Sequence, residues 1–208
     1  MKKSSFVLFL LFSAYIQLLS GQINIIYSDP YKNYELGLEL FNKEKYNAAE
    51  EMFINVTSLS TDKESEIYIN AQYYTAICAV ELYHKNAEFL LKYFMDSYPQ
   101  NSKVKMAVFQ LGKLQYRQKK YDDAIKTFET VDIYDLTSDE QIEYYFKSGY
   151  SYFMQNDLAD AKKQFFEIKD YETKYFAAAN YYYAYICYTL GNYDAALLKT
   201  DGNGAVQW

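Results

Sequence analysis

Beyond residue 30, apolar residues recur at helical spacing in segments that are separated by short polar turns. One such segment has apolar residues at 109, 111, 114 and 116, and the next has them at 125, 128 and 131. The polar residues Gln118, Lys119 and Lys120 lie between the two segments. Because a connection this short makes two helices antiparallel neighbours, the pattern predicts pairs of amphipathic helices.

The paired segments repeat along the chain with a period of about 37 residues. Each repeat carries an alanine, with a small residue twelve positions before it, and in most repeats a large apolar residue four positions after it. We expect the small residue and the alanine to face each other where the two helices cross closely, with the large residue of the turn packed over the crossing. The small residues are Gly37, Thr75, Gly112, Gly149 and Ala184, and the alanines are Ala49, Ala87, Ala124, Ala161 and Ala196.

The composition agrees with a helical chain. Seven glycines and two prolines in 208 residues are too few for the many turns of a β-sandwich or barrel. The residues from Thr137 to Glu140 form a capping-box sequence at the start of a helix, and Pro99 is suited to end another. The predicted fold class is all-α, with a repeat array over residues 31–200 and units near 31–61, 64–99, 102–136, 138–170 and 172–199.

The first residues have the pattern of a secretory signal peptide. Lys2 and Lys3 precede a 14-residue apolar run, Phe6–Leu19, and the small residues Ser20 and Gly21 are suited to cleavage. The alternative is a transmembrane anchor, but spanning a bilayer takes about 17–25 apolar residues. We expect residues 1–21 to be a cleaved leader and residues 22–30 to be a linker.

The leader predicts export to the periplasm of a Gram-negative cell or to the cell exterior. A lipid anchor is not expected, because Gln22 rather than a cysteine follows the small residues. No second hydrophobic span occurs in the sequence. After cleavage we therefore expect no stable membrane span, although association with the envelope stays open.

Unit three places Gly112, Tyr121, Ala124 and Phe128 at a spacing that resembles the tetratricopeptide repeat (TPR) family. Units one and four match the pattern as well, whereas unit two departs from it. The resemblance implies a right-handed α-solenoid of about five antiparallel helix pairs. It also suggests, together with the leader, a likeness to exported periplasmic TPR scaffold proteins of Gram-negative bacteria. Because the period exceeds the family's usual length of about 34 residues, we expect slightly longer helices or connections.

The sequence offers little that could carry out a reaction. It has one histidine, and its two cysteines, Cys78 and Cys187, make no metal-ligand pattern. No phosphate-binding loop, dinucleotide fingerprint, nucleophile elbow or HExxH sequence occurs. We predict no enzyme activity, no catalytic residues, no cofactor and no metal site. The net charge of −6 also argues against a nucleic-acid partner.

The family resemblance implies a concave groove lined by the first helix of each pair. At the corresponding positions this chain is aromatic, and Lys113 and Arg117 are the main positive charges. We predict that this groove binds a protein or peptide, because aromatic side chains supply large contact area. An aromatic stripe at helical spacing is also typical of packed core, and that alternative stays open. The candidate groove residues are Tyr34, Phe41, Phe109, Lys113, Tyr116, Arg117, Phe146, Tyr150, Phe153, Tyr181, Tyr185 and Tyr188.

The functional hypothesis is an exported scaffold or assembly factor. The alternative is the sensor or recruitment region of a longer signalling protein or enzyme that has a further C-terminal domain. The second helix of unit five is short, and residues 201–208 are an irregular tail, so we expect a truncated array. A partly exposed apolar face is then expected on the first helix of the fifth repeat, around four residues: Tyr182, Tyr183, Ile186 and Leu190.

Overall fold

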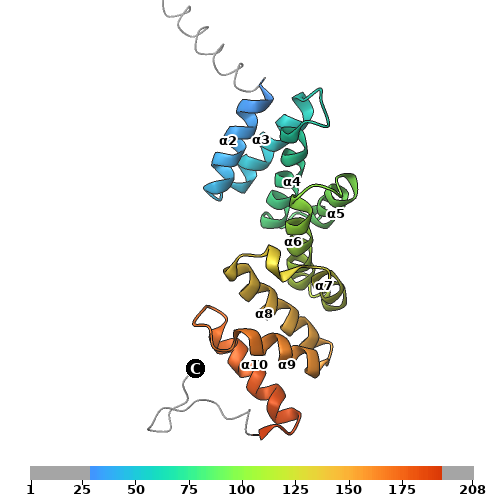
Figure 1. The fold of residues 1–208 in the computed structure, drawn as a ribbon. Helices are drawn as coiled ribbons and strands as arrows, with labels where there is room; N and C mark the ends of the chain where they lie inside the picture. Colours follow the sequence, from blue (N-terminus) through green and yellow to red (C-terminus); the bar gives the residue numbers. More distant parts are fainter. Residues whose placement is uncertain (1–28, 194–208) are drawn as a thin grey trace, which may run out of the picture. The chain divides into compact units, whose positions relative to one another are not determined.

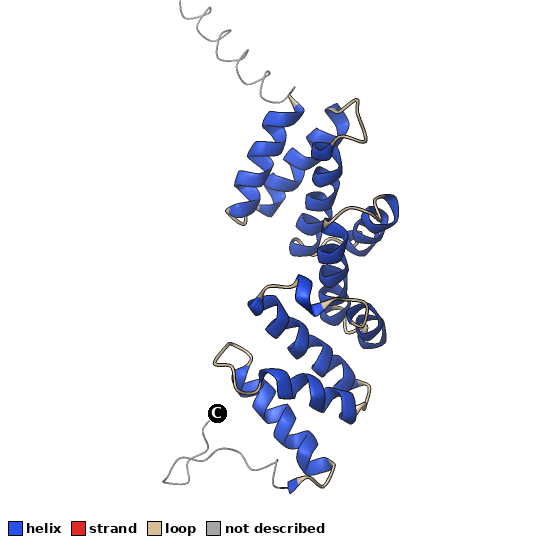
Figure 2. Ribbon diagram, in the orientation of Figure 1, coloured by secondary structure: helices blue, strands red, loops and turns tan. Residues whose placement is uncertain are grey.

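The computed structural model describes residues 29–193, and over that range the chain consists of helices and loops (Figure 1 and Figure 2). The predicted all-α class is therefore confirmed. The predicted leader, most of the linker, the end of unit five and the tail lie outside the described residues. The α-helices are α2 (Pro30–Asn42), α3 (Tyr46–Leu59), α4 (Glu66–Glu81), α5 (Ala87–Ser97), α6 (Lys103–Arg117), α7 (Tyr121–Phe128), α8 (Ser138–Met154), α9 (Leu158–Ile168) and α10 (Phe176–Thr189), and a short 3₁₀ helix, η1 (Ile133–Asp135), precedes α8.

The chain divides after Tyr98 into two compact parts, each larger than one predicted repeat, which we call unit 1 and unit 2. Unit 1 contains α2 to α5, and unit 2 contains α6 to α10. In unit 1, α2 packs on α3, α3 on α4 and α4 on α5. In unit 2, α6 packs on α7, α7 on α8, α8 on α9 and α9 on α10. Each described unit is thus a run of helices in which neighbours along the sequence are neighbours in space.

The turn inside each helix pair has the same backbone structure. One residue per turn has a positive φ of 56° to 75°, and the amide after it bonds back to the carbonyl five residues earlier. In the α6–α7 turn, for example, the Lys120 amide donates to the Gln115 carbonyl at 2.9 Å. This bonding ends a helix by the Schellman arrangement. The left-handed residues are Glu44, Tyr83, Lys119, Asn156 and Gly191.

The helical glycines face a phenylalanine of the paired helix. A Cβ atom built on Gly37 would lie 2.7 Å from Cε1 of Phe53, and one on Gly112 would lie 2.6 Å from Cε1 of Phe128. The three atoms nearest to each of these Cβ positions belong to the phenylalanine, so its ring is the first side chain that the glycine meets. That the small residue also faces the repeat's alanine stays a prediction. The alanines in the described repeats, Ala49, Ala87, Ala124 and Ala161, are all fully buried.

The same phenylalanine also contacts the helix that follows its own pair. In unit 1, the Phe53 ring stacks on Tyr74 of α4 with the centroids 5.1 Å apart and the planes at 17°. In unit 2, the Phe165 ring stacks on Tyr182 of α10 at 5.4 Å and 17°. One ring therefore joins the two helices of its pair to the next helix, and it is fully buried at both places.

We expect Gly112→Ala to lower the free energy of unfolding by about 1–3 kcal/mol, because the added methyl group forces the Phe128 ring to move. The loss should outweigh the gain of about 1 kcal/mol in helix propensity. Thermal unfolding followed by circular dichroism measures the change.

The second repeat suggests the control for this substitution, since it has Thr75 where the first, third and fourth repeats have glycine and Leu91 where they have phenylalanine. The double variant Gly112→Ala/Phe128→Leu should therefore be more stable than the sum of the two single changes predicts, because leucine leaves room for the added methyl group. An unchanged midpoint in the single variant Gly112→Ala would contradict the close contact.

Candidate partner-binding face on unit 2

Several of the predicted groove residues come together in unit 2, on the first helices α6, α8 and α10. The ring centroids of Tyr116 and Tyr150 lie 5.7 Å apart, and those of Phe153 and Tyr185 lie 5.8 Å apart. Tyr150 also contacts Phe153 at 6.4 Å, so the rings make one continuous chain across the three helices. We call this surface the aromatic face, and its residues are Tyr116, Tyr150, Phe153, Tyr181, Tyr185 and Tyr188.

The aromatic face has an anchored half and an exposed half. Tyr150 and Phe153 are half-buried and pack against the core cluster that contains Phe165. On α10, by contrast, Tyr181, Tyr185 and Tyr188 are 51%, 48% and 67% exposed. Their spacing of four and then three residues places them on one side of the helix. The exposed rings of Tyr185 and Tyr181 contact Phe153 and Tyr182, and these two rings pack against the core.

Two further predicted groove aromatics of unit 2 are packing residues, and one of them, Phe146, adjoins the aromatic face through Tyr150, with 6.5 Å between the ring centroids. Phe109 is fully buried in a cluster with Ala124, Phe128 and Leu136, so it cannot contact a partner in this structure. Phe146 is half-buried, and its ring stacks on Tyr175 with the centroids 4.4 Å apart. For Phe109, the alternative interpretation of the aromatic stripe as core is the one that the structure bears out.

In unit 1, the predicted groove residues Tyr34 and Phe41 are half-buried packing residues. Their ring centroids lie 6.4 Å and 5.1 Å from that of Tyr74. Both residues pack against the core cluster that contains Phe53. No chain of exposed rings comparable to that on α10 continues from them among the described contacts of unit 1.

The expected sticky face on α10 is only partly present. Ile186 is fully buried in the cluster that contains Phe165 and Ile168, and Tyr182 and Tyr183 are half-buried against the same cluster. The expectation that Ile186 is exposed is therefore wrong, because α9 covers this side of the helix. Leu190 remains 46% exposed.

A group of charged side chains lies beside the aromatic face. The carboxylate of Glu143 on α8 lies 3.0 Å from Nζ of Lys113 on α6 and 3.4 Å from Nζ of Lys147 on its own helix. All three side chains are mostly buried. Nζ of Lys147 also lies 4.6 Å from the centroid of the Tyr116 ring, which is a cation–π contact. Arg117 lies half-buried one turn after Lys113 on α6.

Sequence reasoning predicted Lys113 but did not select Lys147 as a site residue. The spacing between Glu143 and Lys147, four residues on one helix, is the pattern that could have identified the pair. Tyr175 was missed as well, because it lies in the loop before α10 rather than on a first helix.

Burial and the contact between Glu143 and Lys147 act in opposite directions on the pKa values of these two residues. Burial alone would raise the pKa of Glu143, but the ammonium groups of Lys113 and Lys147 outweigh it and lower that pKa. Burial is the main cause that lowers the pKa of Lys147, and Glu143 opposes it only in part. The carboxylate is therefore ionised at neutral pH and holds both lysines in place.

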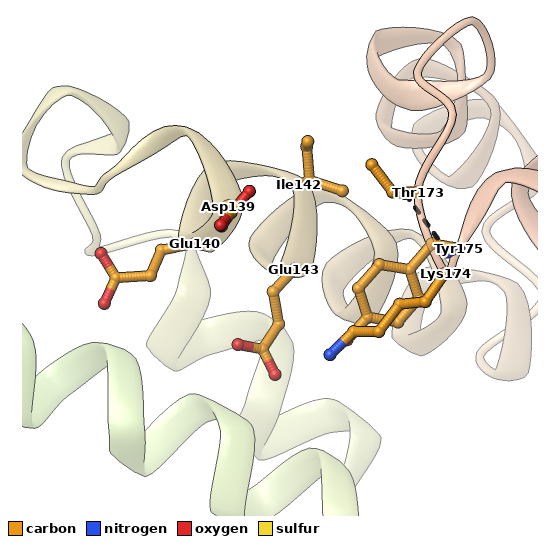
Figure 3. A pocket seen from close by; sticks show the side chains of 7 residues that line it. All are labelled: Asp139, Glu140, Ile142, Glu143, Thr173, Lys174 and Tyr175. Atoms are coloured by element: carbon orange, nitrogen blue, oxygen red, sulfur yellow. Dashed lines mark hydrogen bonds between the residues drawn. The ribbon is translucent and has the colours of Figure 1, made fainter. Parts of the chain in front are cut away.

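A cavity of ≈ 350 Å³ adjoins the charged group (Figure 3). Its walls come from the first turns of α8 and from the loop before α10, and Figure 3 shows Glu143 and Lys174 on opposite sides of it. Glu143 lines the cavity and also binds the two lysines, so the cavity and the charged group share one carboxylate. The lining residues are Asp139, Glu140, Ile142, Glu143, Thr173, Lys174 and Tyr175.

The described part of the chain holds no cluster suited to a metal ion and no exposed cysteine. Between residues 29 and 193, no three side chains of histidine, cysteine, aspartate or glutamate are placed to hold a metal ion. Cys78 and Cys187 are buried free thiols, and burial raises the pKa of Cys78 to about 12. Within the same range, no helix has the length and apolar character needed to cross a bilayer. Unit 2 presents ring faces, phenol hydroxyls, carboxylates and ammonium groups.

Consecutive antiparallel helix pairs, joined by one recurrent buried ring, define a helical-repeat protein of the α-solenoid class. One tetratricopeptide repeat model matches residues 146–200, and a second matches residues 107–129. Unit 2 therefore contains tetratricopeptide repeats.

Solved structures share this fold. MamA of AMB-1 is 16% identical with a TM-score of 0.62, over 81% of this chain and 86% of that one. A protein described as a kinesin light chain of Podosopora anserina, with nearly identical TPR-like repeats, is 12% identical with a TM-score of 0.56, over 82% of this chain and 90% of that one. No curated protein matches the sequence.

Glu143→Gln should lower the free energy of unfolding at neutral pH by about 1–3 kcal/mol, because it leaves two mostly buried ammonium groups without their carboxylate. The folded-state pKa of Glu143 lies below its unfolded value. Its contribution is therefore complete above the unfolded pKa and disappears as the pH falls through the folded pKa.

The measurement is the thermal midpoint between about pH 6 and pH 3, which brackets the ordinary carboxylate range. We expect the wild type to lose more stability over this range than Glu143→Gln does. Glu172→Gln, which changes an exposed residue of the loop before α10, is the matched control and should follow the wild type. Parallel curves for all three proteins would contradict the role of Glu143.

Proposed function

We propose that this protein is an exported scaffold or assembly factor that binds a segment of a partner protein on the aromatic face. The observation that carries the proposal is the row Tyr181, Tyr185 and Tyr188, which is about half exposed and continuous with the half-buried rings of α8. Exposed aromatic groups that a core holds rigidly are typical of binding hot spots, since they give up little conformational entropy. TPR proteins commonly act through such protein–protein contacts, which supports this reading.

Export is supported by the order of charged, apolar and small residues at the start of the sequence. We propose a periplasmic or secreted location, with cleavage after Gly21. Expression of the full chain in a Gram-negative host, followed by fractionation and mass spectrometry of the intact protein, tests both points. A mature protein that begins at Gln22 in the periplasmic fraction is expected. A chain that keeps its leader in the cytoplasm would contradict the proposal.

The double variant Tyr181→Ala/Tyr185→Ala should weaken partner binding by at least about tenfold, because each ring contributes on the order of 1 kcal/mol or more at a hot spot. The partner is first captured from the native envelope by crosslinking to the wild-type protein, and its affinity is then measured with purified components. Helicity and the thermal midpoint should change little, since both side chains are about half exposed.

The matched control is Phe89→Ala/Tyr93→Ala, which removes another exposed stacked pair at the same spacing, on α5 of unit 1. This control should leave partner binding unchanged. Equal binding by the wild type and the Tyr181→Ala/Tyr185→Ala variant would exclude the aromatic face as the site.

A further inference from the structure

The chemistry of the aromatic face narrows the kind of segment that it can bind. Helix α10 contains no charged residue, so its exposed tyrosines offer ring faces and hydroxyl groups alone. On the α6 and α8 side of the face, the ammonium groups of Lys113 and Lys147 both bind Glu143. An acidic partner would have to displace that carboxylate, and a basic partner would meet no acid on α10. The face therefore favours an uncharged segment.

The exposed rings are arranged as ridges rather than as a flat surface. The rings of Tyr181 and Tyr185 are nearly parallel, with an angle of 23° and centroids 6.4 Å apart. The ring of Phe153 stands almost perpendicular to Tyr185, at 75° and 5.8 Å. The surface therefore presents ring faces and ring edges at different angles, against which flat aliphatic rings can pack.

The hydroxyl groups of this surface are hydrogen-bond donors at neutral pH. The ordinary pKa of a tyrosine hydroxyl is about 10, and burial raises the pKa of Tyr116 on this face further. These phenols therefore keep their protons. A segment that presents unpaired carbonyl groups would complement them.

We propose that the segment bound on the aromatic face is an uncharged, proline-rich stretch in the polyproline II conformation. This inference rests on the binding function proposed above for the same face. A polyproline II helix has no internal hydrogen bonds, so its carbonyls are free to accept from tyrosine hydroxyls. Its pyrrolidine rings are flat and apolar, and grooves lined by aromatic side chains are the established kind of receptor for them. The segment is already extended and stiff before it binds, so little conformational entropy is lost.

The test uses the mature full chain and three labelled peptides of equal length: decaproline, an uncharged glycine–serine peptide and an acidic peptide. Fluorescence anisotropy measures the affinity of each. We expect saturable binding of decaproline and much weaker binding of the other two. Tyr185→Ala should weaken decaproline binding by at least about tenfold, and Tyr185→Phe, which removes the hydroxyl group alone, by roughly three- to tenfold. Tyr134→Ala removes a tyrosine that is 90% exposed on η1, and it should change nothing.

Each other outcome overturns the inference in a recognisable way. Tyr185-dependent binding of the acidic peptide without decaproline would reject the proline-rich segment and leave the aromatic face as a binding site. Equal binding of decaproline and the glycine–serine peptide would reject the polyproline II conformation. If no peptide binds in a Tyr185-dependent way, the inference fails, and the proposed function is then decided separately by the crosslinked native partner.

Discussion

The contact between a helical glycine and one phenylalanine ring is the constraint on which the first, third and fourth repeats depend. Without a side chain at Gly112, the Phe128 ring can lie directly against the first helix of its pair, where an added Cβ would be 2.6 Å from it. Gly37 makes the same arrangement with Phe53. The ring that fills this space is then positioned to contact the next helix as well. One small residue therefore determines both how a pair closes and how the following helix is placed.

The aromatic face is a consequence of the same packing. Tyr182 stacks on Phe165 and is thereby fixed in the core, while its neighbour Tyr181 points to solvent on the same helix. Tyrosine is suited to both positions, because its ring can be buried and its hydroxyl group can remain hydrated or hydrogen-bonded. The high tyrosine content of the chain, 26 residues in 208, thus serves the core and the surface together. A rigid set of exposed rings results without any charged residue on α10.

Sequence reasoning predicted the helix pairs well because helix formation and short turns are governed by local spacing. It was less successful where the outcome depends on how far a neighbouring helix covers a given position. Phe109 and Tyr181 each lie three positions before the small residue of their repeat, yet the first is fully buried and the second is about half exposed. The close contact between the glycine and the phenylalanine ring was missed for a related reason: spacing gives the side of a helix but not the depth to which a ring enters.

The left-handed turn residues have a practical consequence for this chain. Four of the five are not glycine, although an L-residue in this conformation costs roughly 1–2 kcal/mol. The turns form because backbone hydrogen bonds end the helix, and the side chains at these positions are exposed. Lys119 and Asn156 therefore lie at sites where the side chain contributes little to the helix end that it marks. A cysteine introduced at either position can carry a spectroscopic label on the surface of a repeat in the middle of the array, away from the core.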